Sequence, residues 1–286
     1  MNTFWQNLYY KTFKSGSKLN LLIGINVIVF LAINIPATVE GLFHPSTIGS
    51  YADDYLALPS YLPKLLNRFW TPLTYMFMHA GIFHILFNML WLYWMGQIFE
   101  EFLGKKRTLG LYLLGGLAGA ALYVISYNIF PAFTQTGLVV GSRAIGASAS
   151  VMAIIVGAAT IVPDYTISLM FIGPVRLKWL VLVYIAIDFL SITGPNAGGE
   201  IAHLSGALVG FVYVKQLQNG KDWIASISKL FKAKPKMRVV SNNREKSSVG
   251  VPRQEDVDKI LDKISKTGYE NLSKQEKEIL FRASKK

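Results

Sequence analysis

Six apolar segments separated by short polar connections constrain the fold of this 286-residue chain more than any other feature. All are rich in aliphatic and aromatic residues, and they cover about 19–36, 76–99, 109–130, 145–162, 177–192 and 201–214. A membrane-spanning helix needs about 20 largely apolar residues. Hydrophobic residues make up 52% of the chain and charged residues only 16%, which is unusual for a soluble domain. The sequence predicts an all-α, polytopic membrane protein with six spanning helices.

The basic residues in the connections predict how these helices are oriented. Lysine and arginine in short loops favour the cytoplasmic side. Three basic groups fall on the side that the amino terminus shares: residues 105–107, Arg176 with Lys178, and Lys215 with Lys221. We therefore expect both termini to lie in the cytoplasm.

Changes in composition divide the chain into four parts. Residues 1–18 form a polar cytoplasmic segment, 19–217 the membrane domain, 218–251 a basic linker and 252–286 a small terminal unit. The net charge is +12, and 17 of the 29 Lys and Arg lie after residue 215. Basic residues beside membrane spans attract anionic headgroups, and no nucleic-acid-binding motif accompanies them. We expect this charge to face membrane lipid and no nucleic acid.

The terminal unit has the pattern of two short amphipathic helices. Its first apolar residues recur at helical spacing: Val257, Ile260, Leu261 and Ile264. Ser273 followed by Glu276 has the spacing of a capping box, which marks the start of a second helix. We expect a helical hairpin that binds an unknown partner or the membrane surface.

The fourth and sixth apolar segments are built to pack closely against each other. Small residues recur at every fourth position: Ala149, Ala153 and Gly157 in one, and Ala202, Gly206 and Gly210 in the other. This spacing lets helix backbones approach inside lipid. In the predicted topology, Ser148 and His203 lie about one helical turn below the same membrane face. Ser148 alone would fit as a packing residue, but a histidine within reach is the base that a weak nucleophile needs.

The second segment adds polar side chains at the same depth. His79, His84 and Asn88 lie in its outer half, and the last two are spaced i and i+4, so they share one face. Alone, they would fit interhelical hydrogen bonds. Beside a serine and a histidine they fit as donors to an oxyanion. The His-Glu-x-x-His zinc motif is absent, and we expect no metal and no cofactor.

Together these residues resemble the rhomboid intramembrane serine proteases of the bacterial type, over about residues 20–215. The resemblance rests on His79, on His-Ile-Leu-Phe-Asn at 84–88, on Gly96 with Glu100, on Gly-Ala-Ser at 146–148 and on Ala-His-Leu-Ser-Gly-Ala-Leu-Val-Gly at 202–210.

The resemblance implies a six-helix bundle in a bacterial inner membrane, with Ser148 as nucleophile and His203 as general base in a dyad without an acidic third member. It also implies an oxyanion site formed by His84, Asn88 and the Ser148 backbone amide. The fifth segment would be a lateral gate that admits a substrate helix from lipid.

Three positions depart from the family pattern. Ala149 follows the serine where the family usually has glycine, and Met152 stands where a tyrosine often packs on the catalytic histidine. In the first outer loop, Trp70-Thr71 with Arg68 nearby replaces a Trp-Arg pair. None of these changes removes a group that the chemistry requires.

The main hypothesis is therefore a serine protease that cuts transmembrane protein substrates through Ser148 and His203, with a terminal hairpin that is dispensable for catalysis. The alternative is an inactive rhomboid-like protein that binds or escorts membrane proteins. A transporter is disfavoured because Asp188 and Glu200 lie near the outer end and no polar path continues inward. We expect Asp188 to be solvated.

Overall fold

The computed structural model describes residues 3–169, 173–230 and 252–284. The chain forms two compact units, Met1–Lys232 and Ala233–Lys286, and each is considered by itself. The larger unit holds every residue predicted to carry chemistry.

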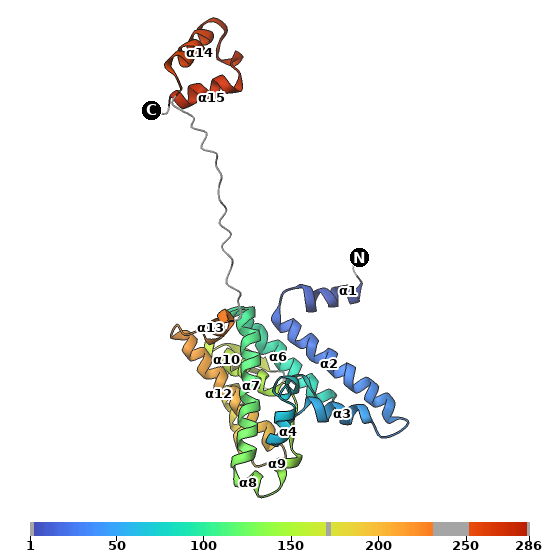
Figure 1. The fold of residues 1–286 in the computed structure, drawn as a ribbon. Coiled ribbons are helices and arrows are strands. Elements are labelled where there is room, and N and C mark those ends of the chain that lie inside the picture. Colours follow the sequence, from blue (N-terminus) through green and yellow to red (C-terminus); the bar gives the residue numbers. More distant parts are fainter. Residues whose placement is uncertain (1–2, 170–172, 231–251, 285–286) are drawn as a thin grey trace. The chain divides into compact units, whose positions relative to one another are not determined.

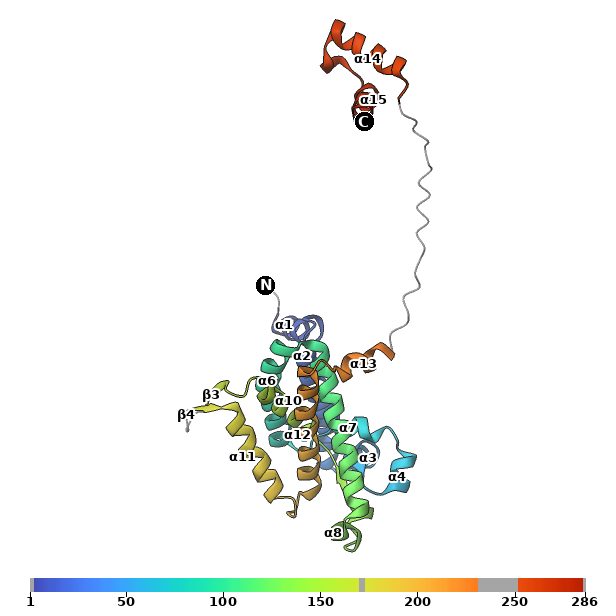
Figure 2. The ribbon, with the colours of Figure 1, turned by 90° about the vertical axis from the view of Figure 1, so that its left-hand side faces the viewer.

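All six predicted apolar segments are helical (Figures 1 and 2). The helices are α2 (Lys18–Gly41), α6 (Ile82–Leu103), α7 (Lys105–Ile129), α10 (Ser148–Ile161), α11 (Leu177–Leu190) and α12 (Ala197–Gln218). Of these, α2, α6, α7 and α12 are long and apolar enough to cross a membrane, whereas α10 and α11 have 14 residues each. The prediction of an all-α, polytopic membrane protein is confirmed.

Helix α10 lies in the middle of the unit, where it contacts α6, α7 and α12 (Figures 1 and 2). Every residue from Ala149 to Ala159 is buried. At 1.5 Å per residue, 14 residues span about 21 Å, which is shorter than the hydrocarbon core of about 30 Å. A helix surrounded by protein does not need to match the bilayer thickness, because its ends meet other helices rather than lipid.

Small residues set the spacing around α10. A methyl group on Gly206 of α12 would overlap the backbone oxygen of Ala149, and one on Gly210 would overlap that of Ala153. On the α7 side, a Cβ on Gly119 would lie 2.6 Å from the Ala149 Cβ. These glycines let the backbones approach as the sequence pattern predicts.

Helix α2 is attached to α6 by two residues of the family pattern. The Glu100 carboxylate accepts a hydrogen bond of 3.0 Å from the backbone N–H of Leu19, in the first turn of α2. A side chain on Gly96 would strike Leu19. Gly96 and Glu100 therefore serve the fold, since they fix the start of α2 against the bundle.

The connection between α2 and α6 contains short helices, as well as one strand. These elements are α3 (Thr47–Leu56), β1 (Leu58–Pro59), α4 (Leu62–Asn67), α5 (Thr71–Thr74) and the 3₁₀ turn Tyr75–Phe77. Strand β1 pairs antiparallel with β2 (Arg143–Ala144), just before α10. The pairing ties this connection to the segment that leads into Ser148.

An ion pair takes the place of the family's Trp-Arg anchor in this connection. The Arg68 guanidinium lies 2.6 Å from the Asp54 carboxylate and over the ring of Tyr55. Arg68 and Lys64 together hold the pKa of Asp54 well below its ordinary value. The Trp70 indole N–H donates to the Tyr55 backbone oxygen at 2.8 Å. These contacts join the segment around residues 54–55 to the segment around residues 68–70. The connection is therefore anchored although Thr71 replaces the arginine of the family's Trp-Arg pair.

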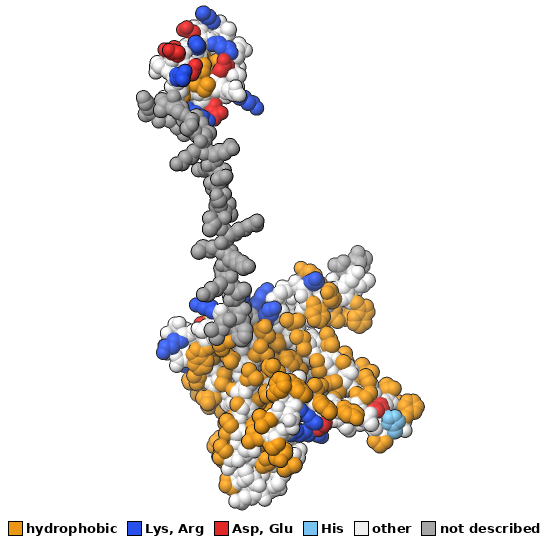
Figure 3. All heavy atoms as spheres, viewed as in Figure 1, with side chains coloured by type: hydrophobic (Ala, Val, Ile, Leu, Met, Phe, Trp, Pro, Cys, Tyr) orange, Lys and Arg blue, Asp and Glu red, His pale blue; other side chains and the backbone are white. Residues whose placement is uncertain are grey.

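The remaining elements of the larger unit are short. They are α1 (Phe4–Tyr9), the π turn Tyr10–Lys14, α8 (Pro131–Thr134), α9 (Leu138–Gly141), the hairpin of β3 (Thr166–Leu169) and β4 (Gly173–Arg176), and α13 (Trp223–Leu230). Apolar side chains cover most of the face of this unit shown in Figure 3; basic side chains lie toward one end, and a further basic group lies beside acidic side chains in the middle of that face. This distribution is typical of a bundle that lies in lipid.

The terminal unit contains α14 (Gln254–Thr267), the 3₁₀ turn Tyr269–Asn271 and α15 (Lys274–Ala283). The predicted capping box is present, with Ser273 and Glu276 bonded to each other's backbone N–H. Lys263 of α14 reaches the Glu276 carboxylate at 2.8 Å. The predicted pair of short helices is confirmed.

The prediction of a linker over 218–251 is wrong in its first part, because α13 packs on α7. Ile224 is buried against Gly110, and the Asp222 carboxylate pairs with Arg107 at 2.9 Å. The Tyr213 hydroxyl also donates to Asp222 at 3.2 Å. With only 8 residues, α13 is too short for its sequence pattern to distinguish an amphipathic helix from a linker. Residues 231–251 lie outside the described residues.

A chain that ends after Lys232 should therefore keep the thermal stability of the full chain, whereas one that ends after Asn219 should lose about 2 kcal/mol. The loss is expected because burying an isoleucine side chain contributes about 1.5–3 kcal/mol. Thermal unfolding followed by circular dichroism in one detergent would compare the three chains. Equal midpoints for the two truncated chains would contradict a stabilising role for α13.

Candidate active site

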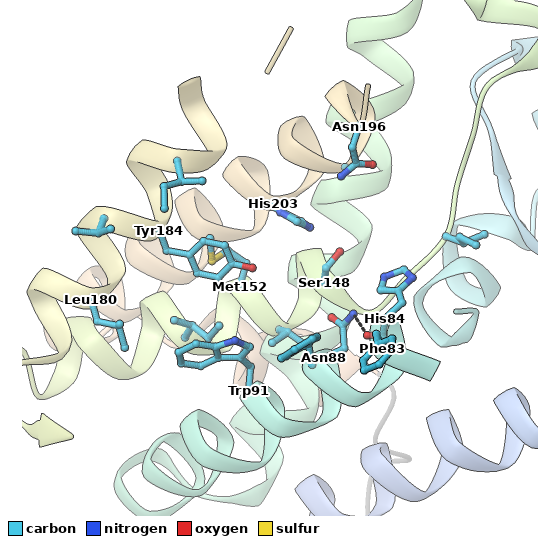
Figure 4. A pocket seen from close by; sticks show the side chains of 17 residues that line it. Phe83, His84, Asn88, Trp91, Ser148, Met152, Leu180, Tyr184, Asn196 and His203 are labelled. Carbon is cyan, nitrogen blue, oxygen red and sulfur yellow. Dashed lines mark hydrogen bonds between the residues drawn. The ribbon is translucent and has the colours of Figure 1, made fainter. Parts of the chain in front are cut away.

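The predicted site residues all line one pocket, which has a volume of about 670 Å³. Its walls come from α6, α10, α11 and α12 (Figure 4). Ser148, His203, His84 and Asn88 face this pocket together with apolar side chains of α6 and α11. The fold thus brings together four residues that are separated by up to 119 positions in the sequence.

Ser148 is the first residue of α10 and is half-buried. The chain enters this helix through Gly146, which has φ +129°, a conformation that side chains disfavour. The Gly146 backbone N–H donates to the Tyr75 backbone oxygen at 2.9 Å, and this bond fixes the turn before α10. The first backbone N–H groups of a helix lack intrahelical partners, and the helix dipole favours negative charge there. The Ser148 amide is therefore suited to bind an oxyanion.

The position of His84 indicates which of its ring nitrogens carries the proton. The backbone N–H of Ala80 lies 3.4 Å from His84 Nδ1 and donates to it. A neutral imidazole that accepts at Nδ1 carries its proton on Nε2. A Cβ on Gly146 would lie 2.9 Å from that Nε2, so the N–H is beside the turn that leads to Ser148. His84 can thus donate a hydrogen bond next to the serine.

Asn88 lies one turn further along α6 and is buried. Its amide nitrogen donates to the His84 backbone oxygen at 2.9 Å (Figure 4). Because an amide group has two N–H donors, one remains for a ligand in the pocket. The bond to His84 fixes the orientation of the Asn88 amide, and the side chain lines the pocket.

His203 stands in the first half of α12, and Figure 4 shows its ring beside the Ser148 side chain. Within the described residues, no hydrogen bond joins the Ser148 hydroxyl to this ring. Such bonds are often long in free enzymes and shorten when substrate binds. A nucleophile, a base and three donors in one pocket form a set that can catalyse acyl transfer.

Comparison with known families agrees with this arrangement. Residues 66–218, more than half of the chain, match the family described as the Rhomboid domain. The chain belongs to the rhomboid family. Residues 243–286 match a family of unknown function, DUF6576, which gives the terminal unit a family but no role.

Two relatives from Arabidopsis thaliana illustrate the similarity. This rhomboid is 32% identical to RHOMBOID-like protein 12, mitochondrial, over 162 residues, which are 54% of this chain and 48% of that protein. It is 30% identical to RHOMBOID-like protein 1 over 159 residues, which are 54% of this chain and 37% of that protein. The chain thus covers about half, or less, of the length of these relatives.

Two departures from the rhomboid pattern are accommodated by neighbouring helices. Where the family often has a tyrosine on α10, this rhomboid has Met152, but Tyr184 reaches the pocket from α11 (Figure 4). The centre of its ring lies 6.5 Å from that of His203, at an edge-on angle. The methyl group of Ala149 is accommodated because α7 has Gly119 opposite it.

The expectation that Asp188 is solvated is wrong. Its side chain is 4% exposed, and its Oδ2 lies 3.3 Å from His203 Nδ1. Glu200, in the first turn of α12, places Oε2 3.8 Å from the same nitrogen. Two carboxylates therefore lie beside the candidate base, while the dyad without an acidic third member that the resemblance implies stays a prediction. A charged residue in an otherwise apolar helix was the signal that could have found Asp188, since such residues usually face the interior.

His79 differs from its predicted place as well. It does not lie on the second helix but in the extended segment between the 3₁₀ turn and α6, because α6 begins at Ile82. It is 5% exposed, and its ring centre lies 5.0 Å from that of His84, edge-on. His79 therefore packs behind His84 and away from the pocket lining.

One group of side chains has the composition of a cation site. Asp188, Glu200 and His203 each offer one ligand atom, and these atoms lie within 4.8 Å of one another. A cation there would occupy the Nδ1 of the candidate base. The expectation that this protein needs no metal or cofactor stays a prediction.

Proposed function

We propose that this rhomboid is an intramembrane serine protease that hydrolyses peptide bonds of transmembrane proteins. The Ser148 hydroxyl attacks the substrate carbonyl carbon while His203 takes its proton, which gives a tetrahedral oxyanion. His203 then returns the proton to the leaving amine as the C–N bond breaks. Water, deprotonated by His203, attacks the acyl ester and releases Ser148 and the second product.

The observation that carries the proposal is the convergence of donors beside Ser148. The oxyanion would accept from His84 Nε2, from the free N–H of Asn88 and from the Ser148 amide. Donors fixed before the reaction stabilise the negative charge as it develops, and one such donor contributes about 10²–10³-fold in kcat. An inactive protein would have no need to fix an asparagine and a histidine tautomer around one serine.

The shape of the pocket supports a helical, apolar substrate. Aromatic residues of α6 and aliphatic residues of α11 form its side walls: Phe83, Phe87, Trp91, Leu180, Val183 and Ile187. Helix α11 is mostly exposed and buries only three of its residues, and Figure 2 shows it at the edge of the bundle. The Trp91 and Tyr184 rings, 6.4 Å apart, bridge α6 and α11. We propose that α11 moves away from α6 to admit the substrate from lipid.

The substrate must present an extended backbone to Ser148. A helix satisfies its own backbone groups, so a segment with glycine or other poor helix formers unwinds at lower cost, by about 1 kcal/mol for each glycine. We therefore propose transmembrane segments with small or helix-breaking residues near their outer end as substrates. Other membrane proteins are thus the partners of this site, and lipid surrounds it.

We also propose a bacterial inner membrane as the location, with both termini in the cytoplasm. The bacterial type of the motifs and the basic connections support this placement. Two of these basic residues, Arg176 and Lys178, pair with Asp164 next to the β3–β4 hairpin, which would lie at the cytoplasmic end of the bundle. Arg107 and Asp222 lie at the same end of α7 and α12.

Labelling with a fluorophosphonate tests the proposal, because this probe forms a bond only with an activated serine. Purified full-length protein in detergent should be labelled, and the Ser148→Ala variant should lose all labelling. Ser150→Ala is the matched control, since Ser150 lies in the same helix turn, is buried and points away from the pocket lining; it should be labelled as the wild type is. Folded wild type that takes up no probe but binds a transmembrane client would favour the inactive, escorting alternative.

A further inference from the structure

We propose that Asp188 is a positioning residue for His203, so that a carboxylate of α11 orients the base of the serine–histidine pair. The inference rests on the proposed function. It concerns a residue of α11, the helix that also forms one wall of the pocket.

The geometry places the Asp188 carboxylate beside the Nδ1 edge of the His203 ring. Asp188 Oδ2 lies 3.3 Å from His203 Nδ1. Both atoms are buried, and within the described residues neither makes a hydrogen bond, so each is an unsatisfied polar atom 3.3 Å from the other. An unpartnered buried carboxylate oxygen costs several times the net value of a hydrogen bond. A small rotation of the His203 ring that brought Nδ1–H into line with Oδ2 would satisfy both atoms at once.

Glu200 contributes to the same edge in a weaker way. Its Oε2 is 3.8 Å from His203 Nδ1, beyond hydrogen-bond distance. Its Oε1 accepts from the Asn196 amide at 3.3 Å. Glu200 is therefore held by its own helix turn, and Asp188 is the carboxylate that is closer to the ring and more deeply buried.

This pairing determines how the ring can act on Ser148. A proton on Nδ1 that is donated to Asp188 leaves Nε2 with its lone pair, which is the form that can take the serine proton. The carboxylate also stabilises the imidazolium that forms during attack. Tyr184, one turn before Asp188 on α11, packs edge-on against the same ring. Helix α11 thus provides an aromatic ring that packs on His203 and a carboxylate that can orient it. In the family, the packing often comes from a tyrosine at the position of Met152.

A consequence is that α11 links substrate entry to catalysis. Leu180 and Val183 of this helix line the pocket, while Asp188 holds His203 from its last turn. A displacement of α11 that opened the pocket would also change the contact with His203. We infer that the base is fully oriented only when α11 has returned to the bundle.

The Asp188→Asn variant tests the proposal in the full-length protein. Its size is unchanged, but its amide can donate to Nδ1 and favour the wrong tautomer. We expect kcat for a transmembrane substrate to fall by about 10²–10⁴-fold, with KM within about threefold of the wild type. Asp164→Asn, at an exposed aspartate, should keep the wild-type kcat. Glu200→Gln should lose less than Asp188→Asn.

A spectroscopic measurement avoids dependence on the stability of the variant. In wild-type protein with ¹⁵N-labelled histidine, His203 should carry its proton on Nδ1, with a proton resonance shifted far downfield by the carboxylate. The Ser148→Ala variant should keep this signal, and His203→Ala should remove it. A wild-type His203 that is protonated only on Nε2 would overturn the proposal.

Other outcomes separate this inference from the function on which it rests. A wild type without any protease activity would refute the function, whereas an active wild type with an equally active Asp188→Asn would refute the inference alone. A larger loss in Glu200→Gln would assign the role to Glu200 instead. Activity that a chelator removes and zinc restores would show that the three groups hold a cation, which would also overturn the proposal.

Discussion

Replacing His203 by alanine is expected to lower kcat for cleavage of a transmembrane substrate by about 10⁴-fold or more. A serine hydroxyl is a weak nucleophile without a base, and loss of the base from a coupled nucleophile and base removes most of the acceleration. KM should change by no more than about threefold, because the apolar side chains that form the side walls of the pocket remain in place. The fluorophosphonate should no longer label Ser148.

His44→Ala is the matched control for this variant. His44 lies in the loop after α2, with a side chain that is 59% exposed and a distance of 3.9 Å to Glu40. It should retain the wild-type kcat. Cleavage by folded His203→Ala within tenfold of the wild type would contradict the assignment of His203 as the base and would leave His84 as the imidazole to test next.

The fold was predictable because a chain can adopt only a few backbone structures inside a bilayer. Every backbone group inside lipid needs a partner within the protein, so long apolar segments become helices. The ends of those helices were less predictable. Helix α6 begins at Ile82 rather than near residue 76, because the preceding residues form a 3₁₀ turn and an extended stretch. As a result, His79 precedes α6 instead of lying on it, and its ring packs against that of His84.

A site residue could be predicted where its spacing along a helix, or a family motif, indicated which side chains lie near it. His84 and Asn88 share a face because they are four residues apart, and Ser148 and His203 meet because small residues bring α10 and α12 together. Asp188 could not be placed in this way, since α11 has no such pattern of small residues. Its contact with His203 depends on the rotation of one helix about its own axis, which hydropathy does not specify.

The departures from the family pattern show why single positions can mislead. Met152 lacks the aromatic ring that often packs on the catalytic histidine, but α11 brings the Tyr184 ring and the Asp188 carboxylate close to His203. Ala149 in place of glycine adds a methyl group beside Ser148, and Gly119 on α7 leaves room for it. In both cases a residue far away in the sequence supplies what the local motif lacks.

Gly206→Ala is expected to cause a large combined loss of stability and activity. Its methyl group would overlap the backbone oxygen of Ala149, and a backbone atom cannot rotate away as the end of a side chain can. Overpacking of this kind costs about 1–3 kcal/mol or more. The thermal midpoint measured in detergent should fall by several degrees, since about 1 kcal/mol corresponds to 2–4 °C at this chain length.

The same substitution should lower kcat/KM by about 100-fold, because Ala149 is next to Ser148 and His203 is one turn before Gly206. Moving α12 away from α10 separates the two groups, and a misplacement of 1 Å can cost about 10²-fold in rate. Gly41→Ala is the matched control: Gly41 ends α2, and a Cβ there would contact nothing. Because alanine favours helix over glycine, that variant should be at least as stable as the wild type. A Gly206→Ala variant with wild-type midpoint and activity would mean that close approach of α10 and α12 does not position the serine and the histidine.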